Sequence, residues 1–305
     1  MSSATQPPTK DVSIGVAPPG FRMPATLQLG PVSLQVSDLA RSLEYYLRVL
    51  GLRVLRQGDG EVTLAAHGDD VPLVHLRERR GVRPASRQGL LGLYHFAVLL
   101  PERAALGRFI AHLAELGERA GASDHLVSEA LYLRDPDGLG IEVYADRPRT
   151  DWRADGGQIV MATEPLDLAA VVAAAHGEPW NGMPAGTRMG HVHLHVADLD
   201  EASRFYHEAL GLDRMVWSYP GALFLAAGGY HHHLGLNTWA GTGARPAGEQ
   251  DARLLEWRIA LPATQAARAR ESLEAAGRAV TPADGGWRTT DPWGTALVVT
   301  GDLND

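Results

Sequence analysis

The chain has 305 residues, of which 45 % are hydrophobic and 21 % charged, and its 28 basic and 36 acidic residues give a net charge of −8. This length and composition suit two globular domains with apolar cores, and the acidic balance argues against a nucleic-acid-binding surface or a membrane-surface role. The absence of cysteine excludes disulfides and thiolate ligands, so any metal site must use nitrogen and oxygen donors. No apolar run reaches transmembrane length and no signal-peptide pattern is present, so a cytoplasmic protein is expected.

Residues 1–27 are polar and Pro-rich and are expected to form a flexible tail. After them the sequence repeats itself. Residues 36–52 match residues 196–212 without a gap, with Val, Asp, Leu, Tyr and a final Leu-Gly-Leu recurring in register. An Asp-Pro-x-Gly motif at 135–138 recurs at 291–294. A repeat of this period indicates a fold built from duplicated supersecondary units.

The repeat divides the chain into four units, each expected to fold as a βαβββ module: residues 28–82, 88–148, 188–242 and 250–303. In the first module a strand at 32–36 precedes a helix that Asp38 caps and Gly51 ends, followed by strands at 61–66 and 71–76. Residues 149–187 are rich in Pro and Gly and are interpreted as a linker with one short helix at 166–175. The expected fold class is α+β, with the modules pairing through their sheets into two cups.

The strand expected at 190–196 opens the third module and alternates between two kinds of side chain. One face carries the imidazoles of His191, His193 and His195. The other face carries Val192, Leu194 and Val196, which should pack on a core. Asp198 then caps a helix at 199–210 that Gly211 ends. Because neutral imidazole is the commonest metal ligand, a strand with this pattern favours a metal site over an ordinary solvated edge.

The four modules differ in the residues that they carry at equivalent positions. At the start of the first strand, the second module has His95 and the third has His191, whereas the first and fourth have proline and glutamate. At the end of the last strand, the second module has Glu142, and the others have arginine, asparagine and valine. Two histidines and one carboxylate are the facial triad of non-haem Fe(II) sites. Taken singly, Glu142 can also be read as a solvated carboxylate and His95 as a hydrogen-bonded core imidazole.

A second group of polar residues accompanies this triad. The run 231–233 places three histidines at the last strand of the third module, and His125 and Tyr132 lie in the second. Because successive strand residues alternate faces, at least one histidine of the run should point into the cup. Imidazole and phenol can exchange protons or hold a developing oxyanion. The alternatives are an adventitious metal-binding run, a turn histidine with satisfied hydrogen bonds and a core aromatic residue.

These motifs resemble the vicinal oxygen chelate superfamily, and within it the type I extradiol dioxygenases typified by two-domain bacterial catechol 2,3-dioxygenases. The resemblance extends from residue 29 to residue 300 and implies the glyoxalase/bleomycin resistance/dioxygenase fold. It implies that His95, His191 and Glu142 bind Fe(II), or Mn(II), which accepts the same ligands. His232 would match the family's acid–base histidine, His125 its histidine beyond the metal ligands, and Tyr132 its active-site tyrosine.

The reaction implied is the opening of a catechol by O₂ beside its two hydroxyls, to a 2-hydroxymuconic semialdehyde. In better-known members the ligands come from the last two units. Here they lie in the middle two, so modules 2 and 3 are expected to pair around the metal and modules 1 and 4 to form a structural pair. Two other functions stay open from the sequence. One is a glyoxalase-like isomerase or lyase, although Asn237 replaces its second carboxylate, and the other is a drug-binding resistance protein that needs no metal. Exposed sheet edges would allow a homodimer.

Overall fold

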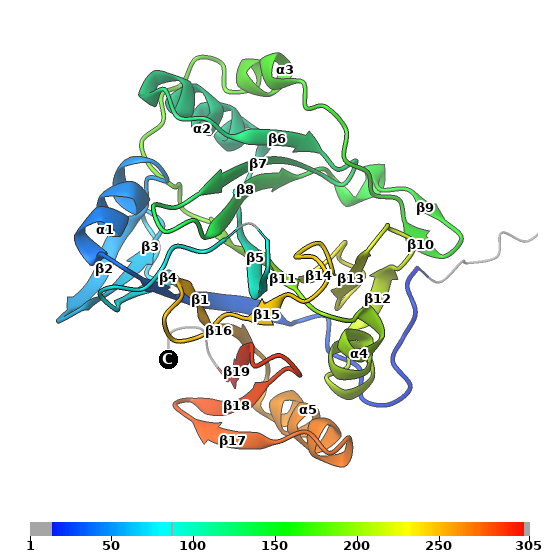
Figure 1. Cartoon of the computed structure of the whole chain (residues 1–305). Helices are drawn as coiled ribbons and strands as arrows, with labels where there is room; N and C mark the ends of the chain where they lie inside the picture. The colour runs from blue at the N-terminus through cyan, green and yellow to red at the C-terminus, as the bar shows by residue number, and fades with distance from the viewer. Residues whose placement is uncertain (1–13, 87, 302–305) are drawn as a thin grey trace, which may run out of the picture.

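The structure is a computed structural model that describes residues 14–86 and 88–301. Four modules join into two large sheets, and the helices lie at the periphery (Figure 1). The α+β class expected from the repeat is confirmed. Within the described ranges, none of the helices has the length and apolar character that crossing a membrane requires.

Modules 1 and 4 share an eight-stranded sheet, in the order β17-β18-β19-β16-β1-β4-β3-β2. Module 1 consists of β1 (Gln28–Val36), α1 (Leu39–Arg48), β2 (Arg53–Gly58), β3 (Glu61–Ala65) and β4 (Pro72–Glu78). Module 4 consists of β16 (Arg253–Ala260), α5 (Ala263–Ala275), β17 (Val280–Ala283), β18 (Gly286–Thr290) and β19 (Ala296–Thr300). The antiparallel pair of β1 and β16 joins the two modules.

Modules 2 and 3 share a second sheet, in the order β12-β13-β14-β11-β5-β8-β7-β6, so the pairing of modules is the one that the ligand distribution predicted. Module 2 consists of β5 (Leu90–Leu99), α2 (Arg103–Leu116), β6 (Gly121–Asp124), β7 (Ser128–Arg134) and β8 (Gly140–Asp146). Module 3 consists of β11 (Arg188–His195), α4 (Leu199–Ser203), the π-helix η2 (Arg204–Ala209), β12 (Asp213–Val216), β13 (Ala222–Ala226) and β14 (Leu234–Asn237). The short strand β15 (Arg245–Pro246) pairs with β5.

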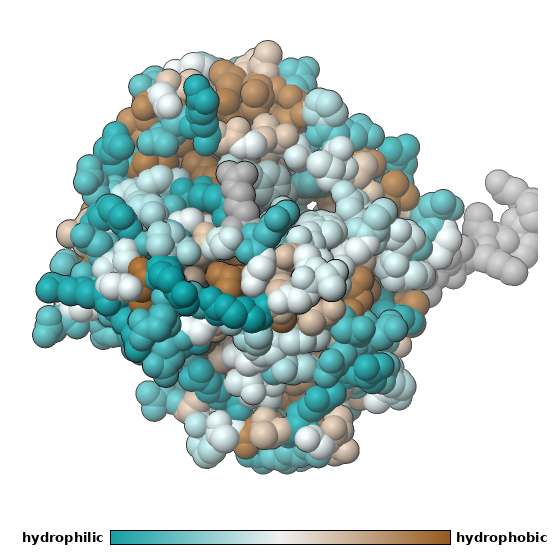
Figure 2. Space-filling model, in the orientation of Figure 1, coloured by the Kyte–Doolittle hydropathy of each residue, from teal (hydrophilic) through white to brown (hydrophobic). Residues whose placement is uncertain are grey.

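The segment between modules 2 and 3 carries the expected short helix and more structure besides. It contains η1 (Arg149–Asp151), β9 (Ala154–Asp155), β10 (Gln158–Ile159) and α3 (Leu168–Ala173). With these elements the segment is an ordered crossing from β8 to β11. Figure 2 shows hydrophobic residues at the top of the molecule, over α2 and α3, and Leu168 of α3 is 44 % exposed.

The repeated helices begin and end as their sequences predict. The Asp38 side chain accepts a hydrogen bond from the Arg41 amide at 3.0 Å, and the Asp198 side chain accepts one from the Glu201 amide at 2.7 Å. These are N-cap interactions that satisfy otherwise unpaired amides. Gly211 has a φ of +96°, a conformation that glycine adopts without steric cost and that ends the helix. The second half of the predicted 199–210 helix is wound as a π-helix.

The repeated tyrosine forms a hydrogen bond with the aspartate of the repeated Asp-Pro turn. The Tyr46 hydroxyl of module 1 donates to Asp135 of module 2 at 3.2 Å, and the Tyr206 hydroxyl of module 3 donates to Asp291 of module 4 at 3.0 Å. All four side chains are buried. The duplicated motifs thus tie each odd-numbered module to the one that follows it in the chain.

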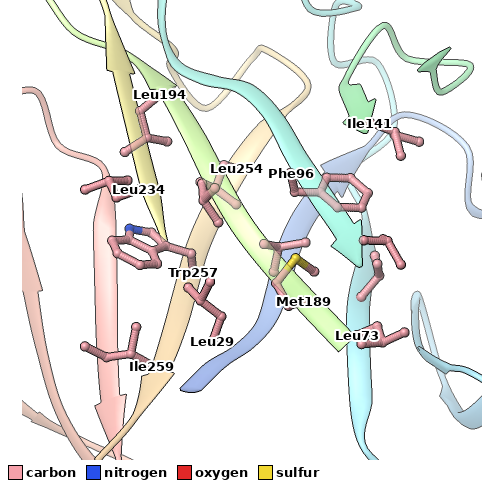
Figure 3. Packing of buried hydrophobic residues seen from close by; sticks show 14 of the residues in the cluster. Leu29, Leu73, Phe96, Ile141, Met189, Leu194, Leu234, Leu254, Trp257 and Ile259 are labelled. Atoms are coloured by element: carbon pink, nitrogen blue, oxygen red, sulfur yellow. The ribbon is translucent and has the colours of Figure 1, made fainter. Parts of the chain in front are cut away.

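The backs of the two sheets share one apolar core. Leu194 of β11, Leu234 of β14 and Trp257 of β16 belong to the same buried cluster, and Figure 3 shows them in this layer. Across it, β1 lies against β11 and β16 against β5. Because the aliphatic face of β11 packs into this core, its three histidines point to the opposite, concave face.

The part of the predicted tail that the structure describes is packed, so the prediction of a flexible tail is wrong for residues 14–27. Val16 pairs with Arg214 of β12 through two backbone hydrogen bonds, at 2.8 and 3.0 Å. Phe21 and Met23 are buried in the main core. Composition marked this stretch as polar, but its few apolar side chains find a hydrophobic surface on module 3. Residues 1–13 lie outside the described ranges.

Candidate active site

Three adjacent strands bring His95, Glu142 and His191 onto one face of the sheet. Ala97 of β5 lies opposite His191 of β11 on one side and opposite Glu142 of β8 on the other. His95 precedes Ala97 by two residues and therefore points to the same face. The side chain of Ala97 ends at Cβ, which leaves room between the three larger groups.

The three side chains converge on one point. The Nε2 atoms of His95 and His191 are 3.3 Å apart, and they lie 2.9 and 3.1 Å from Oε2 of Glu142. Ligand atoms bonded at about 2.1 Å to one ion and at right angles to each other would be about 3 Å apart. The donor set therefore fits a divalent metal with its facial positions occupied, and it is the metal-competent group found in the described part of the chain.

The protonation states of these groups also suit a metal. Burial lowers the pKa of His95 below its ordinary value. Burial alone would raise the pKa of Glu142, but the imidazoles of His191 and His95 beside it hold that pKa well below the usual range. Neutral imidazole and ionised carboxylate are the forms that coordinate metals.

The triad lines a cavity of about 210 Å³ on the concave face of the sheet. The other lining residues are mostly aromatic, apolar or imidazole side chains: Tyr94, Ser123, His125, Tyr132, Met161, Ala162, Thr163, His193, Tyr219, Phe224, His232 and Trp239. The three predicted catalytic residues, His125, Tyr132 and His232, are thus all in the same cavity as the predicted ligands.

His125 and Tyr132 form a hydrogen-bonded pair on one side of the cavity. Tyr132 lies opposite Glu142 in the β7–β8 ladder, and its hydroxyl is 2.6 Å from Nε2 of His125. The other ring nitrogen, Nδ1, lies 2.7 Å from the Ala162 carbonyl. Leu126, in the turn after His125, has a φ of +69°, a costly conformation that the Asp124 side chain helps to maintain by accepting from the Leu126 amide at 2.9 Å.

His232 lies on the other side, with its ring centroid 4.1 Å from that of His191. Its Nδ1 is 2.7 Å from Nδ1 of His231, whose Nε2 is 2.9 Å from Asp146. Asp146 also accepts from the Tyr230 hydroxyl at 3.0 Å. The histidine run was expected in the last strand of module 3, but it lies in the bend just before β14, so strand alternation does not apply to it. Of its three members, only His232 lines this cavity.

The other two histidines of β11 both contact Asn237, and His193 also lines the cavity. The Asn237 side chain lies 3.0 Å from Nε2 of His193 and 2.6 Å from Nδ1 of His195. Gly235 permits this arrangement, because a Cβ there would stand 2.7 Å from the His193 ring. Asn237 is therefore occupied with imidazoles and does not offer the carboxylate that a four-ligand site of the glyoxalase type would need.

Loops and the linker complete the cavity wall. Tyr219 and Trp239 come from loops of module 3, which are natural candidates for pocket walls. Met161, Ala162 and Thr163 come from the linker and were not foreseen from the sequence, because long-range contacts place a linker and its composition gives no signal of them.

The chain matches the model of the Glyoxalase/Bleomycin resistance protein/Dioxygenase superfamily over residues 28–143 and 188–296. The chain belongs to this superfamily. The two matched stretches cover two modules each, which is the duplication seen in the sequence, and the linker lies outside them.

A curated member of known name is similar over most of the chain. The catechol-2,3-dioxygenase of Bacillus subtilis is 46 % identical over 237 residues, which are 77 % of this chain and 82 % of that protein. The resemblance inferred from the motifs is thereby confirmed.

Solved structures share the superfamily fold at low identity. A proposed dioxygenase from Bacillus subtilis aligns with a TM-score of 0.62 at 15 % identity, covering 92 % of this chain and 85 % of that one. Glyoxalase I from Zea mays aligns with a TM-score of 0.53 at 18 % identity, covering 90 % of this chain and 92 % of that one. At these identities the likeness supports the fold alone.

Proposed function

We propose that this protein is an extradiol dioxygenase that opens a catechol with O₂ to a 2-hydroxymuconic semialdehyde-type product. His95, His191 and Glu142 would hold Fe(II), or Mn(II). The observation that carries the proposal is the convergence of these three ligand atoms in a cavity that also contains His125, Tyr132 and His232. The 46 % identity to a catechol-2,3-dioxygenase supports the same activity.

Three protein ligands on one side suit this chemistry. A bound Fe(II) would supply the redox-active Lewis acid through which catechol and O₂ react. The chain contributes a fixed set of ligands, a cavity of mainly aromatic and apolar walls that limits water, and side chains that handle protons. In the overall reaction both atoms of O₂ enter the product and the ring carbon–carbon bond beside the hydroxyls breaks.

Tyr132 and His125 would receive a catechol proton. A backbone carbonyl only accepts, so Nδ1–H of His125 donates to Ala162, and a neutral His125 accepts at Nε2 from the Tyr132 hydroxyl. Burial, with Glu142 close by, raises the pKa of Tyr132 well above its ordinary value, so Tyr132 stays a neutral phenol. Its oxygen retains a lone pair that can accept from a catechol hydroxyl, while its own proton passes toward His125.

His232 would move the second proton. Its Nδ1 is bonded to His231, which leaves Nε2 as the nitrogen that can take a proton from the substrate and return it when the oxygen–oxygen bond breaks. General acid–base catalysis of this kind contributes about 10²–10⁴-fold in rate.

The test is to purify the protein under nitrogen, measure iron and manganese, and then add catechol in air-saturated buffer. We expect one bound metal ion per chain, O₂ uptake equal to the catechol consumed, and a yellow ring-opened product. Metal-loaded protein that consumes no O₂ with any simple catechol would overturn the proposal, as would conversion of catechol to quinone without ring opening.

A further inference from the structure

Part of the linker forms a roof over the cavity. Gln158 of β10 accepts, through Oε1, hydrogen bonds from the Trp217 and Ser218 amides at 2.7 and 2.9 Å, just beyond β12. Six residues later, Glu164 exchanges two backbone hydrogen bonds of 2.9 Å with Asp124 at the end of β6. β12 and β6 are the two edge strands of this sheet. Residues 158–164, here called the roof segment, therefore join opposite edges of the curled sheet, and Figure 1 shows the chain passing from β10, beside β12, toward α3.

The roof segment is held by packing as well as by hydrogen bonds. Ile159 is 3 % exposed, in an apolar cluster with Val216 and Phe224, and Met161 packs against the same cluster. The Thr163 hydroxyl is 2.8 Å from the Tyr219 hydroxyl. The segment is thus fixed in place above the site.

The roof residues that line the cavity, Met161, Ala162 and Thr163, are uncharged, and so is the wall beneath them. Met161, Tyr219, Phe224 and Trp239 give this side of the cavity an apolar and aromatic surface. Among the described residues that line the cavity there is neither lysine nor arginine. A carboxylate or sulfonate on a bound ring would be desolvated here without a cation to pair with it, which is strongly unfavourable.

We infer that the roof segment makes this site selective for catechols whose ring substituent is uncharged and apolar, and that it excludes catechols carrying an anionic substituent. The inference rests on the proposed function for the substrate class. Its source is a segment outside both stretches matched by the superfamily model, so the shared fold does not prescribe it.

A neighbouring groove offers the competing location for an anion. It shares Tyr94, His95 and Tyr132 with the cavity, and it is also lined by Arg119 and Arg134. A carboxylated catechol could be accommodated only if its substituent reached this groove. The experiment must therefore separate the two surfaces.

The decisive measurement is calorimetric binding of two ligands of similar size, 4-methylcatechol and 3,4-dihydroxybenzoate, to iron-loaded protein under nitrogen. We expect the methyl compound to bind at least about tenfold more tightly. Met161→Arg should narrow or reverse this preference by supplying a cation at the roof. Leu168→Arg adds the same charge to α3 at a site that is 44 % exposed, and it should leave the preference unchanged.

Equal affinity of the wild-type protein for the two ligands would overturn the inference. So would tight binding of the carboxylate that is lost in Arg134→Gln, because the anion would then occupy the neighbouring groove. The wild-type comparison needs no variant, so misfolding of Met161→Arg would not obscure the result. If the ligands bind but their rings are not cleaved in air, the result contradicts the proposed function. The binding preference between the two ligands is still measured in that case.

Discussion

The imidazoles of His231 and His232 meet at their Nδ1 atoms, 2.7 Å apart. On its other side His231 faces Asp146, at 2.9 Å from Nε2. A carboxylate only accepts, so Nε2 of His231 is the donor, and a neutral His231 must then accept at Nδ1. His232 therefore carries its proton on Nδ1, and its Nε2 is left with a lone pair. Asp146, which does not line the cavity, thus determines the tautomer of the proposed acid–base residue.

Asp146→Asn should lower kcat because an amide can donate as well as accept, and the tautomers of His231 and His232 are then no longer fixed. We expect a loss of about tenfold or more, with metal content and KM for catechol little changed. Steady-state kinetics and metal analysis on the same preparation measure both. Tyr230→Phe is the matched control, because it removes a hydrogen bond to Asp146 and leaves the carboxylate in place. If Asp146→Asn has the kcat of the wild type, Asp146 has no part in the mechanism.

His232→Ala should retain the metal and lose turnover by about 10²–10⁴-fold, because the proton acceptor is gone and the ligands are intact. Metal analysis and O₂ uptake are the measurements. His233→Ala is the control from the same run, since its ring contacts the Ala227 amide and does not line the cavity. If turnover survives in His232→Ala, another group carries the proton.

His191→Ala should lose bound metal and ring cleavage while the protein stays folded. Loss of a residue that hydrogen-bonds a metal ligand lowers metal affinity by roughly 10–100-fold. Loss of the ligand itself should lower metal affinity by more than this. Metal content after dialysis and the thermal unfolding midpoint are to be compared. His193→Ala is the control for metal content alone, because this histidine lines the cavity on the same face of β11 but its Nε2 contacts Asn237. Equal metal loss in both variants would contradict the assigned triad.

Asp135 gives a prediction for stability against pH. Burial raises the pKa of this carboxyl to about 7 in the folded protein, from an ordinary value of 3.8. The folded state then binds more protons than the unfolded state between these values. The contribution to stability is therefore fully present below about pH 4 and is lost as the pH rises through 7, at no more than about 1.4 kcal/mol per pH unit.

In Asp135→Asn this titration is absent, so the variant should gain stability relative to wild type as the pH rises from 4 to 7. Urea unfolding at several pH values in that range measures the difference in the free energy of unfolding. Asp59→Asn, at an exposed position in the turn after β2, controls for loss of a carboxyl as such. A difference between Asp135→Asn and wild type that stays constant with pH would show that Asp135 is ionised in the folded protein.

Much of this protein could be predicted from its sequence because the signals are local or repeated. Alternation in β11 assigned histidines to one face and aliphatic residues to the other, and the fourfold repeat gave the modules. Comparing equivalent positions across the repeat singled out His95, Glu142 and His191, since only the middle modules together carry two histidines and a carboxylate at these positions. The register of adjacent strands then brings these three together.

Other features were decided only by the tertiary structure. The approach of Asp146 to His231, the hydrogen bonds from Tyr46 and Tyr206 to aspartates of the next module, and the packing of residues 14–27 on module 3 all join segments far apart in sequence. The composition of the roof segment is that of a loop and predicts only a plain linker. Strand periodicity determines which face of the sheet a side chain occupies. Which distant loop covers that face depends on contacts with both edge strands of the sheet. These contacts are long-range, so no local sequence pattern predicts them.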